Sequence, residues 1–242
     1  MVEPVSRLRL SLRLQAVANM VSRGKTLADI GTDHAYLPIY LVGQGWIPRA
    51  IGIEAQEEPW RRARANVAAA GLSHLIDIRL GWGLKPLRPG EVGVVTIAGL
   101  GGKTIQDILS ASPEILENIE CLVLQPQGAE VLLRRWLASS GWRLGQEELV
   151  CEKEQYYLIY AWERGSNPEY SVWEWEFGPL LLQRRHPLLG GYLKKRLKKL
   201  ERIQQGLARS RRPEALARLR KLNLERQAIQ EVLACLPNAG RS

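Results

Sequence analysis

The chain has 242 residues, of which 45% are hydrophobic, so it is long enough for one sizeable domain with a smaller appendage and apolar enough to form a core. Its three cysteines, Cys121, Cys151 and Cys235, are scattered, which argues against a disulfide framework or a zinc site, and three histidines offer little material for any metal. No apolar run approaches the roughly 20 residues that cross a bilayer, and no early run has the flanks of a signal peptide. We therefore expect a cytoplasmic protein without a membrane span or a metal.

Positive charge is concentrated towards the C-terminal end of the chain. Residues 182–242 hold 16 Lys and Arg against 4 Asp and Glu, whereas residues 1–181 hold 18 against 21. Such asymmetry indicates a polyanionic partner that is bound by one end of the molecule. The alternative is a solvated helix surface that needs Lys and Arg only for solubility.

Strands and helices alternate along most of the chain. In chain order, hydrophobic periodicity predicts a helix over residues 5–22, a strand over 26–31, a helix over 35–44, a strand over 49–54, a helix over 58–70, strands over 76–80 and 92–98, a helix over 102–110, a strand over 121–124, a helix over 129–139 and two strands around 147–151 and 156–162. Alternation implies a parallel sheet with helices on both faces. Two strands in succession imply a hairpin, so one strand should run antiparallel. The expected fold is α/β, a Rossmann-like, mostly parallel seven-stranded sheet whose final hairpin resembles that of class I S-adenosylmethionine-dependent methyltransferases.

A linker over residues 165–183 is expected to lead into two long helices. Leucines recur every three or four residues on both sides of the break "ARSRRPE", and the proline of this break suits the first turn of a second helix. Two helices joined by a short loop should pack as an antiparallel, coiled-coil-like hairpin. We expect two domains, residues 1–165 and 166–242, in a monomer; the alternative is that the leucines of the hairpin face a second copy of the chain.

The segment "ADIGTDHAYLP", residues 28–38, lies where a parallel sheet binds its ligand, after the first strand. Gly31 allows a sharp turn close to a ligand, but Asp29 and Asp33 would repel a pyrophosphate, which disfavours dinucleotides and ATP. S-adenosylmethionine carries an ammonium and a sulfonium group and no phosphate, so it suits an acidic loop. Glu54 ends the second strand, where a carboxylate can accept hydrogen bonds from both ribose hydroxyls. The alternative is that Thr32 or Asp33 only caps the next helix and that His34 is structural or simply exposed.

Several further motifs extend this pattern: "LRLSLRLQAVANMV", "AIGIE", "IRLGWGL", "TIAGLGG" and "LVLQPQ". With "ADIGTDHAYLP", they resemble the bacterial tRNA (adenine-22-N1)-methyltransferases of the TrmK type over roughly residues 8–163. The family also carries a basic helical hairpin after this region. The resemblance implies methylation of N1 of a tRNA adenine with S-adenosylmethionine as cofactor; the alternatives are another RNA position or a non-catalytic nucleic-acid-binding protein with a degenerate cofactor fold.

The resemblance also assigns roles to residues. The implied cofactor-binding residues are Asp29, Gly31, Asp33, Glu54, Ala55, Gly81, Trp82, Ala98 and Gly99. The target base is expected beside Leu100, Gly101 and Gly102, which follow the fourth strand. This segment occupies the place of the Asn-Pro-Pro-Tyr motif of amino-group methyltransferases. Arg13 is expected to face the same cleft. The family usually has an aspartate where this chain has Trp82. Either Asp77 or a backbone carbonyl then accepts the hydrogen bond from the adenine amino group, or the affinity for the cofactor is reduced.

The chemistry at an adenine N1 suggests catalytic roles for Asp33, Tyr36 and His34. N1 already carries a lone pair, so the reaction needs alignment rather than a base. Asp33 would stabilise the positive charge that the ring gains, while Tyr36, unless it is only a packing residue, would stack on an extruded base and His34 would contact the base or the tRNA backbone.

The basic end of the chain would hold the tRNA through its phosphates. The residues expected to do so are Lys194, Lys195, Arg196, Lys198, Lys199 and Arg202, with Arg184, Arg185, Arg209, Arg211 and Arg212 nearby in sequence.

Overall fold

A computed structural model describes residues 8–207 and 212–236 of the chain. It divides the chain into two compact units, Met1–Tyr170 and Ser171–Ser242. The boundary expected from the sequence, after residue 165, lies close to this division. Arg209 and Arg211, which we expected near the RNA, lie outside the described residues.

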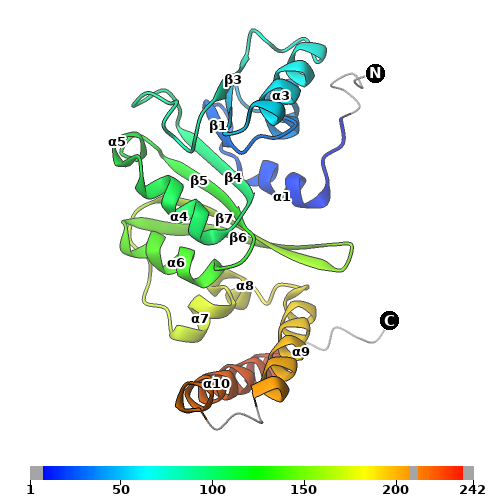
Figure 1. Cartoon of the computed structure of the whole chain (residues 1–242), viewed down its shortest axis with the longest axis vertical. Coiled ribbons are helices and arrows are strands. Elements are labelled where there is room, and N and C mark those ends of the chain that lie inside the picture. The colour runs from blue at the N-terminus through cyan, green and yellow to red at the C-terminus, as the bar shows by residue number, and fades with distance from the viewer. Residues whose placement is uncertain (1–7, 208–211, 237–242) are drawn as a thin grey trace. The chain divides into compact units, whose positions relative to one another are not determined.

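The first unit is built on a seven-stranded sheet in the order β3-β2-β1-β4-β5-β7-β6 (Figure 1). Its strands are β1 (Leu27–Ile30), β2 (Ala50–Glu54), β3 (Ile76–Leu80), β4 (Val94–Leu100), β5 (Cys121–Pro126), β6 (Trp142–Glu152) and β7 (Gln155–Arg164). Strands β1 to β5 are parallel, and β7 runs antiparallel to both β5 and β6. This confirms the mostly parallel sheet and the terminal hairpin.

Helices cover both faces of this sheet. One face carries α1 (Leu12–Met20), α2 (Tyr36–Gly43) and α3 (Glu57–Ala69), whose buried residues share a core with alternate residues of the strands, such as Leu27 of β1 and Val94 of β4. The other carries α4 (Gly102–Ser110), α5 (Pro113–Leu116) and α6 (Glu130–Ser139), and α4 packs on α6 (Figure 1). Because β1, β2 and β5 are covered on both sides, every residue in them is buried.

The β6–β7 hairpin is longer than expected. Strand β6 begins at Trp142, whereas the sequence pattern predicts a strand only around 147–151. The two strands are joined through Lys153 and Glu154, which both have positive φ (49° and 62°), as a tight two-residue turn requires. The turn follows the carboxyl end of β6, so this end of the hairpin lies at the same edge of the sheet as the ends of β1 to β5.

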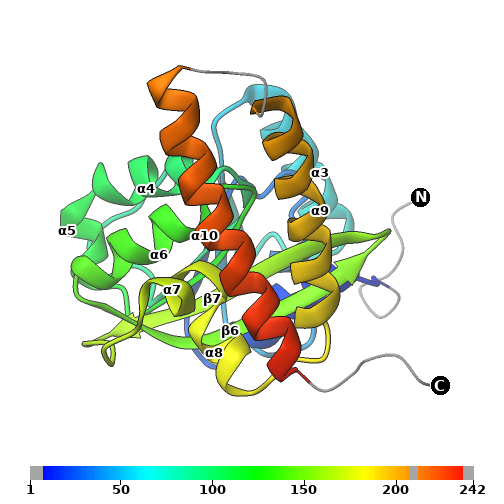
Figure 2. The same cartoon turned by 90° about the horizontal axis from the view of Figure 1, so that it is seen from below.

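In the described part of the second unit, residues 171–207 and 212–236, there are four helices: α7 (Val172–Phe177), α8 (Pro179–Gln183), α9 (Leu189–Leu207) and α10 (Pro213–Cys235). The expectation of a linker over 165–183 is wrong from Ser171 onwards, because a reciprocal capping box between Ser171 and Glu174 starts α7. The paired helices α9 and α10 confirm the expected hairpin, and Figure 2 shows them side by side. Among the described residues, no helix has the length and apolarity needed to cross a membrane.

Candidate active site

The site is built where the parallel strands end. Ile30 of β1 is in register with Ile53 of β2 and Ile97 of β4, and Glu54 is in register with Leu80 of β3. The segments that follow these four strands therefore meet at one edge of the sheet, which we call the carboxyl edge. The residues predicted to bind the cofactor lie in or next to these segments.

The loop after β1 turns through three residues with positive φ: Gly31 (72°), Asp33 (49°) and Ala35 (56°). Such a conformation costs an alanine about 1–2 kcal/mol, so it persists only where the surroundings hold it. Three hydrogen bonds do so here. The Ala35 amide donates to Thr32 O (2.8 Å), the Asp33 amide donates to Glu54 Oε1 (2.6 Å), and Asn66 Nδ2 donates to His34 O (3.0 Å).

Two of the predicted carboxylates lie beneath this loop. Asp29 is only 5% exposed and accepts a hydrogen bond from Thr96 Oγ1 (2.6 Å); burial raises the pKa of its carboxyl group. Glu54 is 9% exposed and is tied to the loop through the Asp33 amide. Of the pair, Asp29 is the more buried and is bonded to β4 through Thr96, whereas Glu54, at the end of β2, is the one bonded to the loop.

The predicted catalytic residues lie together on the outer side of the loop. The rings of His34 and Tyr36 are stacked with centroids 4.9 Å apart and planes 8° apart. The Asp33 side chain is 61% exposed, and its carboxylate lies 3.7 Å from His34 Nε2 and 3.8 Å from Arg62 Nη2. Arg62, on α3, was not singled out in the sequence, because only the fold brings it to Asp33. The structure therefore groups a carboxylate, an imidazole and a phenol ring that is 42% exposed.

The end of β4 and the start of α4 carry three glycines, Gly99, Gly101 and Gly102, around the side chain of Leu100. Gly99 has a φ of 83°, and the pairing of β4 with β5 shifts register between Ala98 and Leu100. At Gly102, a Cβ atom would lie 2.7 Å from Gly128 O, so α4 can start against the loop after β5 only because this residue is glycine. The half-buried Leu100 and Gly101 stand between these two positions.

Arg13 joins the same edge from α1. Its Nη1 donates to Gln125 Oε1 (2.7 Å), its guanidinium lies 5.7 Å from the centre of the Tyr157 ring, and its Nη1 is 3.5 Å from where a Cβ on Gly99 would be. Arg13 therefore lies beside the end of β4, and its expected position at the target base stays a prediction. Gln125 and Tyr157 were missed from the sequence; the "LVLQPQ" motif contained the only signal for Gln125.

At the far side of the site, the loop after β3 carries Gly81 and Trp82. The Gly81 amide donates to Glu54 O (2.7 Å), which places this loop next to the end of β2. Trp82 is 41% exposed, and Lys85 Nζ lies 5.6 Å from the centre of its ring. Arg79 holds the loop closed by donating to Pro86 O (2.8 Å) and, through two nitrogens, to Glu91 (2.8 and 2.6 Å).

Asp77 does not belong to this edge. It is in register with Ile51, near the start of β2, and its carboxylate pairs with Arg79 (2.8 Å). The suggestion that Asp77 replaces the missing acid beside the adenine is therefore wrong, because the strand direction carries it away from Glu54.

The predicted phosphate contacts of the second unit fall into two groups. Five side chains are exposed on α9: Lys194, Lys195, Lys198, Lys199 and Arg202. Arg196 differs, because its guanidinium pairs with Glu176 and with Glu225 (2.7 Å) and is mostly buried. Arg196 therefore joins α7, α9 and α10, and we leave it out of the RNA-binding set. Arg184, Arg185 and Arg212 are also exposed.

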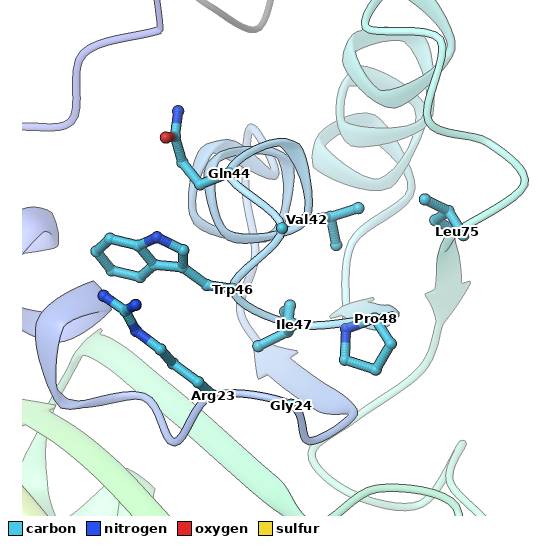
Figure 3. A pocket seen from close by; sticks show the side chains of 9 residues that line it. Arg23, Gly24, Val42, Gln44, Trp46, Ile47, Pro48 and Leu75 are labelled. Carbon is cyan, nitrogen blue, oxygen red and sulfur yellow. The ribbon is translucent and has the colours of Figure 1, made fainter.

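A shallow hollow lies at the opposite edge of the sheet. Its lining includes Arg23, Trp46 and Leu75, which precede β1, β2 and β3, and Figure 3 shows the Arg23 side chain beside the Trp46 ring. The distance from the guanidinium to the ring centre is 4.5 Å. This hollow has no carboxylate in its lining, so it does not share the chemistry of the carboxyl edge. Within residues 8–207 and 212–236, no group of three His, Cys, Asp or Glu side chains is placed to hold a metal ion.

The sheet order, the terminal hairpin and the acidic loop after β1 define this protein as a class I methyltransferase. A family model described as a methyltransferase domain matches residues 10–160. A curated Bacillus subtilis (strain 168) protein named tRNA (adenine(22)-N(1))-methyltransferase is 38% identical over 161 residues, which cover 66% of this chain and 68% of that protein. The chain belongs to the family of tRNA (adenine(22)-N(1))-methyltransferases.

Solved structures agree with this assignment. The crystal structure of the B. subtilis m1A22 tRNA methyltransferase TrmK superposes with a TM-score of 0.87 at 31% identity and covers 94% of this chain and 100% of that one. The Streptococcus pneumoniae protein Sp1610 in complex with S-adenosyl-L-methionine has a TM-score of 0.83 at 38% identity, with coverage of 93% and 100%.

Proposed function

We propose that this enzyme transfers a methyl group from S-adenosylmethionine to N1 of adenine 22 in tRNA. The observation that carries the proposal is the carboxyl edge itself, where Glu54 and Asp33 flank a tight loop beside a bare, glycine-rich loop after β4. Such an edge suits a cationic cofactor without phosphate. The named activity of the B. subtilis relative supplies the target atom.

The residues present fit this cofactor. S-adenosylmethionine, when bound, supplies an electrophilic methyl group on a sulfonium. Glu54, at the end of β2, accepts hydrogen bonds from the ribose hydroxyls, and Gly31 lets the backbone approach the ligand. Gly81 and Trp82, one strand further out, contact the adenine, with Ala55, Ala98 and Gly99 completing the lining. Since Asp77 is turned away, a backbone carbonyl accepts the adenine amino group.

The protein's part in the transfer is to align the base and to stabilise charge. N1 of adenine needs no deprotonation, which agrees with a β4 loop that has Leu100 and Gly101 where amino-group methyltransferases have Asn-Pro-Pro-Tyr. The ring becomes positively charged as the bond forms, and the Asp33 carboxylate stabilises that charge. The His34–Tyr36 stack offers an exposed aromatic surface for the extruded base, which offsets part of the cost of unstacking it.

The tRNA is held by its phosphates, through the exposed Lys194, Lys195, Lys198, Lys199 and Arg202 of α9. A backbone contact of this kind carries no sequence information, so the base is selected at the carboxyl edge and by the shape of the tRNA. We place the enzyme in the cytoplasm as a monomer, because its proposed substrate is tRNA and α9 and α10 pack on each other.

The test is to incubate the purified enzyme with unmodified tRNA and labelled cofactor and to map the methylated nucleotide. Methylation of adenine 22 at N1 is expected; methylation at another position, or none, would contradict the proposal. In the same assay, Asp33→Asn should keep its affinity for the cofactor and lose at least about tenfold in turnover, since one preorganised electrostatic contact is typically worth that much or more. The matched control is Asp107→Asn, an exposed acid on α4. Unchanged turnover in Asp33→Asn would remove the catalytic role of Asp33.

A further inference from the structure

Gln127 is an exposed residue beside the segment where the target base is expected. It follows β5, and its backbone amide donates to Leu100 O (2.8 Å), which fastens the loop after β5 to the end of β4. Its Nε2 lies 3.8 Å from where a Cβ on Gly99 would be. Because Gly99 has no side chain, a flat ring can approach the backbone closely at this point, next to the Gln127 amide.

The two glutamines of the "LVLQPQ" motif have different surroundings. Gln125 is fully buried, and both ends of its side-chain amide are used: Oε1 accepts from Arg13 Nη1 (2.7 Å) and Nε2 donates to Pro126 O (2.9 Å). Gln127 is exposed, and within the described residues its side chain makes no hydrogen bond. Its carbonyl oxygen and its N–H donors are therefore available to a ligand.

The direction of methyl transfer decides which edge of the target adenine meets Gln127. The proposed function places the cofactor on the loops after β1 and β2, and N1 of the base has to point towards its methyl group. Strand β5 lies on the other side of β4 from these two strands. The atoms on the side of adenine away from N1 are N7 and N9, and N9 carries the ribose. The edge formed by N7 and the exocyclic N6 then faces β5, where Gln127 lies.

A glutamine amide is complementary to this edge of adenine. N7 accepts a hydrogen bond and the N6 amino group donates one, and the side-chain amide supplies the matching donor and acceptor together. Arg13, which also lies beside Gly99, has only donors, a pattern that pairs with guanine instead. Of these two side chains, Gln127 is therefore the one able to select adenine.

We propose that Gln127 selects adenine by donating from Nε2 to N7 and accepting at Oε1 from the N6 amino group of the target base. This inference rests on the proposed function and adds a specificity-determining contact on an edge of the base that does not react. Pairing along N7 and N6 leaves N1 uncovered for the transfer. Guanine presents two acceptors at this edge, which would leave Gln127 Oε1 opposite an oxygen without a donor.

A tRNA with 7-deazaadenine at position 22 is the decisive probe, because it lacks only the N7 acceptor. The analogue also changes the reactivity of N1, equally for every variant, so the quantity to compare is the ratio of kcat/KM for the adenine tRNA to kcat/KM for the 7-deazaadenine tRNA. This ratio should be about 3- to 10-fold higher in the wild type than in Gln127→Leu, which is the range of one neutral hydrogen bond. In Gln127→Glu, whose carboxylate cannot donate to N7, the ratio should fall below that of Gln127→Leu.

Two further measurements separate base selection from other roles. On the adenine tRNA, Gln127→Leu should lower kcat/KM about 5- to 150-fold, the range for a two-bond contact with a base. Calorimetry should find its affinity for S-adenosylmethionine unchanged, because Gln127 is assigned to the base alone. The matched control is Gln44→Leu, which removes an exposed glutamine from the hollow at the opposite edge of the sheet and should leave all of these quantities unchanged.

The two proposals fail differently. If the wild type does not methylate adenine 22 of the ordinary tRNA, the proposed function falls. If it does so and the kcat/KM ratio is the same in the wild type and in Gln127→Leu, the assignment of Gln127 to N7 is wrong. A Gln127→Leu variant that loses activity equally on both tRNAs would assign Gln127 to the RNA backbone or, where thermal unfolding also shows a lower stability, to the structure of the loop, and either result would overturn the inference.

Discussion

Replacing Glu54 by glutamine tests whether one carboxylate serves both the loop and the cofactor. Glu54 is almost fully buried, and its Oε1 accepts the Asp33 amide at 2.6 Å. Glutamine keeps the shape of the side chain and can still accept from Asp33, but it turns an N–H group towards the ribose and removes the charge. A hydrogen bond to a charged group contributes about 1.5–3 kcal/mol and a neutral one about 0.5–1.5 kcal/mol.

The difference between these ranges predicts a loss of about 1–2 kcal/mol of cofactor binding, which is roughly a 5- to 30-fold increase in the dissociation constant. Isothermal titration calorimetry with S-adenosylmethionine measures this directly. Glu57→Gln is the matched control, because Glu57 is an exposed acid at the start of α3 that pairs only with Arg61 in the described structure. An affinity of Glu54→Gln within twofold of the wild type, or an equal loss in Glu57→Gln, would refute the role of Glu54.

Two further predictions concern ion pairs of the first unit. Arg134→Met leaves Glu147 buried without the guanidinium that lies 2.9 Å away in the wild type. Urea denaturation should therefore show a loss of about 3–5 kcal/mol in the free energy of unfolding. The double variant Arg134→Met, Glu147→Leu removes both charges and should recover most of this loss. The hydrogen bond from Arg79 lowers the pKa of Glu91 to about 2. The stabilisation of the folded state by ionised Glu91 is therefore complete above the ordinary glutamate pKa of about 4.3 and is lost as the pH falls towards 2. The Glu91→Gln variant should be less stable than the wild type at pH 6, and the difference in the free energy of unfolding should shrink below pH 3. A stability difference that stays constant from pH 6 to pH 3 would contradict this.

The strands of the first unit could be predicted because burial on both faces makes them short, continuous apolar runs. Strand β6 was underestimated for the opposite reason. It alternates buried and exposed residues, and its buried set includes Glu147, whose charge conceals the pattern. In the same way, Arg196 reads as one more cation in a basic helix, although Glu176 and Glu225 enclose it. A buried ion pair has no signature in a single sequence, since neither partner reveals the other.

The grouping of candidate residues was predictable where one loop carries several of them and unpredictable where separate elements contribute one residue each. Asp33, His34 and Tyr36 follow one another closely, so a single motif proposed all three, and their roles stay predictions. Gln125 and Tyr157 come from β5 and β7, and only the packing of α1 brings Arg13 to both. Their sequence surroundings are those of any buried strand, which left no local signal.

The charge division between the two ends of the chain follows from the chemistry of the cofactor. An edge that accommodates a sulfonium and an ammonium group needs carboxylates, and those carboxylates repel the phosphates of an RNA substrate. Residues 1–181 accordingly hold more acids than bases, so they offer no net electrostatic attraction for tRNA. The attraction has to come from a separate set of cations, and we propose that the exposed side chains of α9 provide it. Screening by salt weakens that attraction, whereas it acts much less on the buried Glu54 at the carboxyl edge. On the proposed function, the basic second unit compensates for a catalytic site whose own charge repels its RNA substrate.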